Sequence, residues 1–132
     1  MRFIELMPMG VCAAFPRERF LSAGAVLAAV PELTPIGGDG VAELYRAPGH
    51  RGTVGLIRPL THCFCAACDR IRVTADGRLK PCLHSNAEIP LRGLHGAALE
   101  AAIRGAAYAK PERHHLTQSG SDTPRDMNQI GG

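Results

Sequence analysis

Three cysteines in the stretch "FCAACDRIRVTADGRLKPCL" (64–83) have the residue type and spacing of metal ligands. Cys65 and Cys68 form a C-x2-C pair, and Cys82 follows after thirteen further residues. Thiolates select zinc or iron–sulfur clusters. Asp76-Gly77 is a strong tight-turn signal between two strand-like segments, so a hairpin is expected to return the third cysteine toward the first two.

The spacing alone leaves three interpretations open. A structural zinc site needs four protein ligands, and His62, His84 and Cys63 are candidates for the fourth. The second interpretation is a [4Fe–4S] cluster held by three cysteines, with one iron open for a substrate. The third is a set of buried thiols without a metal.

Two arginines follow the cysteine pair closely. Arg70 and Arg72 are two residues apart, so their side chains point to the same side of the predicted strand. Beside a cluster with an open iron, they could hold an anionic or hydrogen-bonding ligand against it. The alternative is a pair of solvent-facing strand arginines.

Composition and charge exclude several classes of protein. The 132 residues are 45% hydrophobic and carry a net charge of +3, which is typical of one globular domain. No basic run indicates nucleic-acid binding, and no apolar run approaches the ~20 residues of a membrane helix. The five cysteines are an odd number with four of them clustered, which argues against a disulfide framework. We therefore expect a cytoplasmic protein.

The elements that would position these residues can be read from periodicity and turn signals. Alternating residues at 2–8 predict a first strand that pairs with an element preceding it in the chain. Helical spacing at 22–30 predicts a helix with Ser22 as its N-cap. After residue 111 the chain is polar and is expected to be a flexible tail. The predicted elements are strands at 2–8, 41–47, 52–60, 70–75 and 78–83, a loop at 36–40, and helices at 22–30 and 91–110.

Five blocks of the sequence resemble the GTP 3′,8-cyclase family of radical S-adenosylmethionine enzymes. The cysteine stretch resembles the family's C-terminal cluster motif. "RFIELMPMG" is similar to a late barrel strand, and "YRAPGHRGTVGLIRPLTHCFC" is similar to the approach to the cluster. "AYAKPERHHL" looks like the family's Lys-Pro segment, and "MNQIGG" looks like its double-glycine terminus.

The resemblance implies the fold class α/β, here as an α+β fragment: the last elements of an incomplete αβ barrel, then a small antiparallel sheet with a helix. It implies a division into residues 1–35 (barrel strand and helix), 36–110 (Fe–S domain) and 111–132 (flexible tail). The family's barrel carries a C-x3-C-x2-C motif for the cluster that cleaves S-adenosylmethionine. This sequence lacks that motif, so we expect a C-terminal portion that is inactive alone and that needs the barrel in cis or in trans.

The resemblance also implies roles for particular residues. Cys65, Cys68 and Cys82 would hold the second [4Fe–4S] cluster, whose unligated iron meets the purine of GTP. Cys12 and Cys63 match no ligand of the family and are interpreted as incidental. The remaining implied contacts are Arg70, Ile71, Arg72 and Arg2 with GTP, Met7 with S-adenosylmethionine, and Gly131 and Gly132 in the tail that enters the active site.

The reaction that the resemblance implies belongs to molybdenum cofactor biosynthesis. The family, a group of lyases, converts GTP into (8S)-3′,8-cyclo-7,8-dihydroguanosine 5′-triphosphate through a 5′-deoxyadenosyl radical. The resemblance implies no nucleic-acid or membrane partner and leaves a homodimer of the full-length protein open. The alternative function is a stand-alone Fe–S or zinc-binding accessory module without catalysis.

Overall fold

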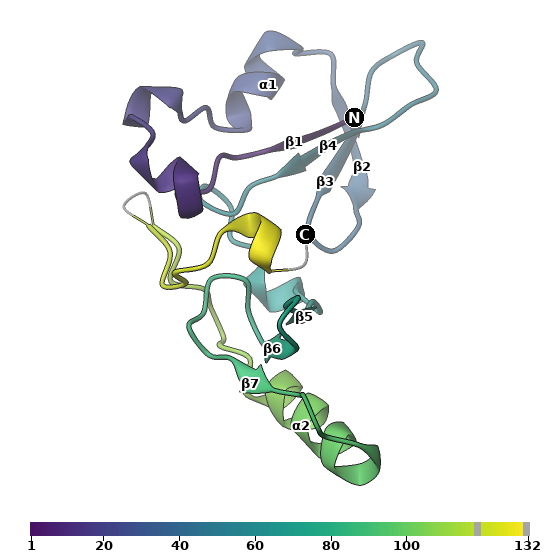
Figure 1. Cartoon of the computed structure of the whole chain (residues 1–132). Coiled ribbons are helices and arrows are strands. Elements are labelled where there is room, and N and C mark those ends of the chain that lie inside the picture. The colour runs from purple at the N-terminus through teal and green to yellow at the C-terminus, as the bar shows by residue number, and fades with distance from the viewer. Residues whose placement is uncertain (118–119, 131–132) are drawn as a thin grey trace.

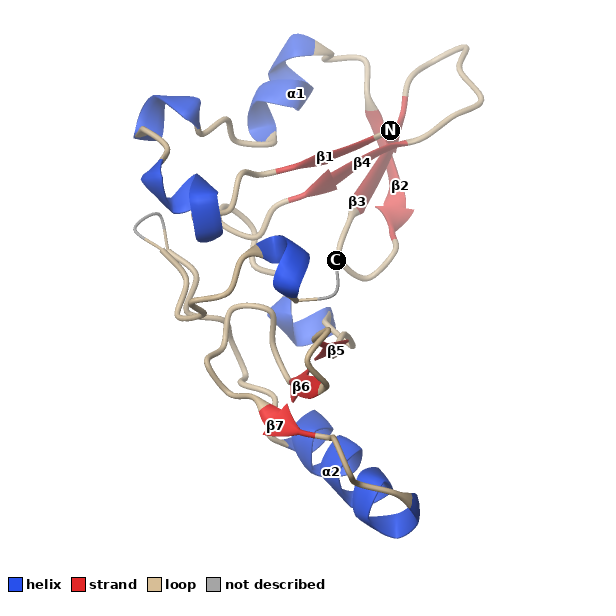
Figure 2. Cartoon of the chain, viewed as in Figure 1, coloured by secondary structure: helices blue, strands red, loops and turns tan. Residues whose placement is uncertain are grey.

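The computed structural model describes residues 1–117 and 120–130 of the chain. Two β-sheets follow one another along the molecule, and the longest helix lies at the end away from the first sheet (Figure 1). The first sheet contains β1 (Arg2–Ile4), β2 (Thr34–Gly38), β3 (Glu43–Arg46) and β4 (Val54–Ile57), and the second contains β5 (Arg72–Val73), β6 (Arg78–Lys80) and β7 (Ile89–Pro90). The α-helices are α1 (Gly24–Ala29) and α2 (Gly96–Tyr108), with 3-10 turns at Gly10–Ala14, Arg17–Arg19, Cys65–Ala67 and Met127–Gln129 (Figure 2). The predicted α+β fragment is confirmed at this level.

The first sheet has the strand order β1-β4-β3-β2, in which β1 runs parallel to β4 and the other pairs are antiparallel. The carboxylate of Glu5, 2% exposed, anchors the end of β1. It accepts hydrogen bonds from the main-chain N–H groups of Ala23, Leu60 and Thr61. Burial alone would raise the pKa of Glu5, but these bonds and the Thr61 hydroxyl outweigh burial and hold the pKa below its usual range. Glu5 thereby joins α1 to the chain that leads from β4 to the cysteines.

Two predictions for the first forty residues were wrong. The segment expected to be a loop from residue 36 lies partly in β2, so the predicted boundary between residues 35 and 36 falls inside a strand of the first sheet. Helix α1 begins at Gly24, and no side chain caps it. The buried residue Ala23, which directly precedes the helix, donates its N–H to the carboxylate of Glu5 at 3.2 Å.

The second sheet contains the predicted hairpin. Strands β5 and β6 pair antiparallel around Asp76-Gly77. Gly77 has φ +78°, and a Cβ there would lie 2.9 Å from Cγ of Arg92, so both the backbone and the close approach favour glycine. The hairpin places the end of the C-x2-C loop before β5 and Cys82 just after β6.

Helix α2 ends two residues before Lys110, just ahead of the predicted stop at Pro111. Its predicted apolar face is only partly covered: Ala106 is its buried residue, whereas Ile103 is 39% exposed. Within residues 1–117 and 120–130, no helix has the length and apolarity that crossing a membrane requires.

The described part of 111–132 does not behave as a tail without a core. It returns alongside the hairpin toward the first sheet (Figure 1), and Leu116 and Ile130 are buried. The fully buried ammonium of Lys80 donates to Oγ1 of Thr123 at 3.2 Å. The polar composition misled the prediction, because polar side chains of this segment pair with buried polar groups of the hairpin.

Replacing Arg125 with glutamine will lower the melting temperature at neutral pH more than at acid pH. The Arg125 guanidinium bonds Glu88 at 2.5 Å and Asp76 at 2.9 Å, and it holds the pKa of both carboxyl groups below the usual range. Groups with a depressed folded pKa stabilise the fold above their unfolded pKa of about 4, and this contribution is lost as the pH falls through the folded values. Thermal unfolding between about pH 3 and pH 7 measures the effect.

The matched control for this prediction is Arg104→Gln, which removes an exposed pair with Glu100 on α2. We expect little change for it at any pH, since exposed pairs contribute little. An Arg125→Gln deficit that is the same at every pH would contradict the electrostatic role.

Candidate functional site

A cavity of about 180 Å³ lies where the first sheet meets the cysteine hairpin. We call it the cysteine cavity. The first sheet contributes apolar walls through Ile4 and Ile57, and the segment after α2 contributes Lys110 and His114. The predicted site residues that line it are Cys65, Cys68, Cys82, Arg70, Arg72 and Met7. Residues far apart in sequence thus meet at one small, partly apolar site.

The three predicted cysteine ligands surround this cavity. Cys65 begins the 3-10 turn Cys65–Ala67, Cys68 follows it, and Cys82 lies just after β6. All three are half-buried free thiols. Burial raises the pKa of Cys65, and the neighbouring thiols of Cys63 and Cys82 raise it further because two nearby thiolates repel each other. Thiolates spaced around a cavity suit an iron–sulfur cluster, in which each cysteine binds a different iron.

Arg70 and Arg72 both line the cysteine cavity, as expected for side chains two residues apart. Arg72 begins β5 and Arg70 lies just before it. The pKa of Asp39, which directly follows β2, is lowered mainly by its hydrogen bond with Arg2 and to a lesser extent by the charge of Arg70. The cavity consequently combines soft donors with two guanidinium groups.

The structure does not bring every predicted residue to the cavity lining. Arg2 pairs with Asp39 and has a side chain that is 48% exposed. Ile71 is 37% exposed and is not part of the lining. Gly131 and Gly132 lie outside the described residues. The GTP contact implied for Arg2 would therefore need a ligand that extends beyond the cavity.

Cys63 is closer to the predicted ligands than its interpretation as incidental allowed. One ligand atom from each of Cys63, Cys65 and His114 lies within 4.8 Å of the other two. These residues do not form a strand: Phe64 has ψ 20° and Cys65 begins a 3-10 turn. Cys12, by contrast, lies in the turn Gly10–Ala14 and does not line the cavity.

The histidines near the cavity differ in environment. His84 is 5% exposed, and its burial and the neighbouring His114 lower its pKa to about 4, so it is neutral at pH 7. Its Nδ1 lies 3.0 Å from Oγ of Ser121, and its ring meets that of His114 edge to face at 5.3 Å. The side chain of His62 is 63% exposed and lies near Glu43 instead. Of the two candidate histidines, only His84 lines the cysteine cavity.

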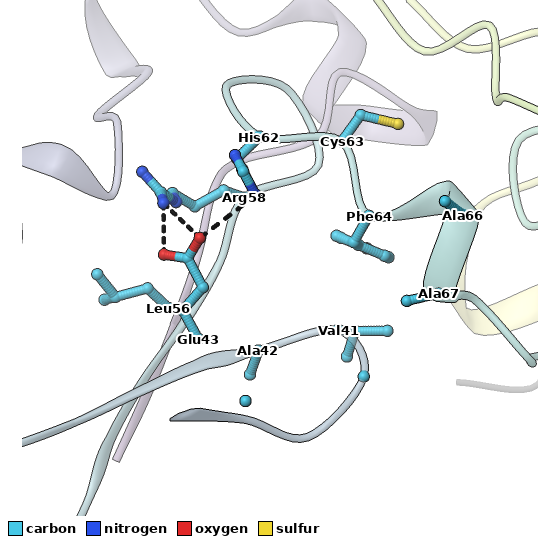
Figure 3. Close-up of a pocket in the computed structure, with 12 residues that line it drawn as sticks. Val41, Ala42, Glu43, Leu56, Arg58, His62, Cys63, Phe64, Ala66 and Ala67 are labelled. Carbon is cyan, nitrogen blue, oxygen red and sulfur yellow. Dashed lines mark hydrogen bonds and ion pairs between the residues drawn. The ribbon is translucent and has the colours of Figure 1, made fainter. Parts of the chain in front are cut away.

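A second cavity of about 320 Å³ lies beside the first, and Val41 and Phe64 line both (Figure 3). Its polar wall is an ion pair between Arg58 and Glu43, and Glu43 also accepts from the Tyr45 hydroxyl at 3.1 Å. Arg58 and Glu43 neutralise each other's charge, although Nε of Arg58 is buried without a partner among the described residues, and Cys63 also lines this cavity.

Sequence reasoning missed Lys110 and His114 as cavity residues. Both belong to "KPERH" (110–114), which directly follows α2. The signal available in the sequence was a lysine and a histidine shortly after the helix, on either side of Pro111. That signal gives no direction in space, and it did not indicate that the segment returns to the cysteines.

The fold and the cavity define a small α+β protein with a cluster of soft donor ligands. Residues 1–116 match the family described as Molybdenum Cofactor Synthesis C. The chain belongs to this family, and the resemblance seen in its sequence is confirmed.

Curated relatives cover nearly the whole chain and are named GTP 3′,8-cyclase. The protein from Alkaliphilus metalliredigens is 44% identical over 99% of this chain and 43% of its own length. Those from Alkaliphilus oremlandii and Peptoclostridium acidaminophilum are 41% and 43% identical over 99% of this chain, which covers 43% and 42% of their lengths. The chain thus spans less than half the length of these relatives.

Proposed function

We propose that this chain is the C-terminal, substrate-binding portion of a GTP 3′,8-cyclase in molybdenum cofactor biosynthesis. The observation that carries the proposal is the cysteine cavity, which gathers Cys65, Cys68 and Cys82 with Arg70 and Arg72. The relatives' name supplies the reaction, a lyase step that converts GTP into the 3′,8-cyclo product. In this proposal the present chain binds the substrate, and a separate portion of the enzyme carries out the radical chemistry.

The donor set fits a three-cysteine [4Fe–4S] cluster. The thiols lie around a cavity with apolar walls, and thiolates are the ligands that such clusters take. When bound, the cluster would supply an iron without a cysteine ligand, where a purine can attach. Arg70 and Arg72 would hold hydrogen-bonding or anionic groups of GTP beside it. Ile71 and Arg2 would contact parts of GTP that extend beyond the cavity, and Met7 would face S-adenosylmethionine.

The remaining portion of the enzyme is proposed to be a radical S-adenosylmethionine barrel that meets this chain at β1. Strand β1 is an edge of the first sheet, and it exposes 39% of Phe3 and 57% of Ile4. An exposed apolar edge strand favours pairing with a further element. Ile4 also lines the cysteine cavity, so a barrel placed there would reach the site.

The purified 132-residue chain alone will not cyclise GTP. It contains no C-x3-C-x2-C motif to bind the cluster that reduces S-adenosylmethionine. Incubation with GTP, S-adenosylmethionine and a reductant, followed by chromatographic detection of 3′,8-cyclo-GTP, checks this. Product formation above that of a heat-inactivated sample would contradict the proposed division of labour.

A stand-alone metal-binding module is the alternative function, and the proximity of Cys63, Cys65 and His114 favours it. Thiolate and imidazole donors converging on one point suit zinc. Such a module would bind its metal without Cys68 or Cys82, which distinguishes it from the cluster.

Anaerobic reconstitution with iron and sulfide, followed by metal and sulfide analysis, tests the proposal. We expect about four iron and four sulfide per chain with broad absorption near 400 nm. Zinc at one per chain, with no bound sulfide in the reconstituted sample, would instead support the accessory module.

A further inference from the structure

Residues 110–114 approach two of the three cavity cysteines with hydrogen-bond donors. Nζ of Lys110 lies 3.6 Å from Sγ of Cys68. The main-chain N–H of His114 donates to Sγ of Cys65 at 3.3 Å. One segment after α2 therefore contacts both sulfurs of the C-x2-C pair.

Lys110 also ties the C-x2-C loop to the third cysteine. Its ammonium donates to the carbonyl of Arg70 at 2.8 Å and to the carbonyl of Pro81 at 3.2 Å. Pro81 directly precedes Cys82. A lysine has three donor hydrogens, and these contacts use them all between the two sides of the hairpin. Lys110 therefore places its positive charge beside Sγ of Cys68 and holds the two sides of the hairpin together.

The ring of His114, which is among the residues lining the cavity, carries a further buried donor. Its Nδ1 accepts from the N–H of Leu116 at 3.2 Å, so the hydrogen of the neutral ring is on Nε2. Nε2 is buried and makes no hydrogen bond of normal geometry to a described residue, although the Pro59 carbonyl lies close enough to act on the ring and raise its pKa against the lowering effect of burial. A buried donor without an acceptor is costly, and His114 lines the cysteine cavity.

We propose that Lys110 and His114 are positioning residues for the cysteine-bound cluster, donating to its sulfur atoms and favouring its reduced state. This inference rests on the proposed function. Reduction adds negative charge to a cluster, and hydrogen bonds and cations at sulfur stabilise that charge. The two residues would thus raise the reduction potential and slow the loss of iron, without themselves being ligands.

The first test compares Lys110→Met with wild type after anaerobic reconstitution with iron and sulfide. We expect a more negative reduction potential and release of iron to bathophenanthroline about tenfold faster, since a hydrogen bond to a charged group is lost. Lys110→Arg should restore most of both properties, because it keeps charge and donors. Arg104→Met is the control, as it removes one positive charge from the exposed face of α2.

The second test compares His114→Phe with His115→Phe. The His115 side chain is 72% exposed and pairs with Asp122, so its replacement should leave the potential unchanged. His114→Phe keeps the main-chain N–H and the ring volume but removes the Nε2 donor, and it should make the potential more negative. If Lys110→Met fails to fold, the reduction potential of His114→Phe still tests the proposed positioning role.

The outcomes separate the two levels of inference. Wild type, His114→Phe and Lys110→Met that hold equal amounts of cluster with equal potentials would overturn the positioning role and leave the proposed function intact. Wild type that holds no iron and sulfide after reconstitution would overturn both.

Discussion

Alanine at Cys65, Cys68 or Cys82 will abolish iron binding by the reconstituted chain. Each of these thiols lines the cysteine cavity, whereas Cys63, although close to Cys65, does not line it and is not expected to replace a lost ligand. Iron and acid-labile sulfide per chain, measured with the absorption near 400 nm, report the loss. Melting temperatures of the metal-free variants should stay close to that of the metal-free wild type, since all three thiols are only half-buried.

Alanine at Cys63 or Cys12 provides the matched control, and both variants should retain the cluster. Cys63 is the sharper comparison, because its ligand atom lies within 4.8 Å of those of Cys65 and His114. Complete loss of metal in Cys63→Ala, together with retention in Cys68→Ala, would contradict the cluster and identify the mononuclear site instead.

Alanine at Arg70 or Arg72 will weaken GTP binding by roughly tenfold or more, because a charge-assisted contact contributes ~1.5–3 kcal/mol. Lysine at either position should also impair binding, since it keeps the charge but loses the planar fork. The experiment requires the barrel, in the full-length protein or supplied in trans. GTP affinity and formation of the cyclised product are measured beside iron content and melting temperature.

The control for the arginine prediction is Arg51→Ala, which removes an exposed arginine from the turn between β3 and β4. It should leave GTP affinity unchanged. Variants of Arg70 and Arg72 that lose the cluster or unfold, while the folded fraction binds GTP normally, would show that these arginines support the fold rather than the substrate.

Local patterns predicted the hairpin well and the ends of the chain less well. The turn at Asp76-Gly77 and the pair β3–β4 follow from residues next to one another, so short-range rules suffice for them. The start of α1 and the packing of the described residues after Pro111 depend on buried partners, Glu5 and Lys80, that lie far away in sequence. Composition alone could not show which polar groups would be paired.

By itself, the sequence determined the cysteine spacing, the arginine pair beside it and the family to which the chain belongs. These properties lie in residue order, and the family match over residues 1–116 confirms the last of them. Only the tertiary structure decided which other groups reach the sulfurs. Lys110 is 42 residues from Cys68, and His114 is 49 residues from Cys65. Their approach depends on how the chain after α2 returns along the hairpin, and no periodicity or local spacing encodes that path.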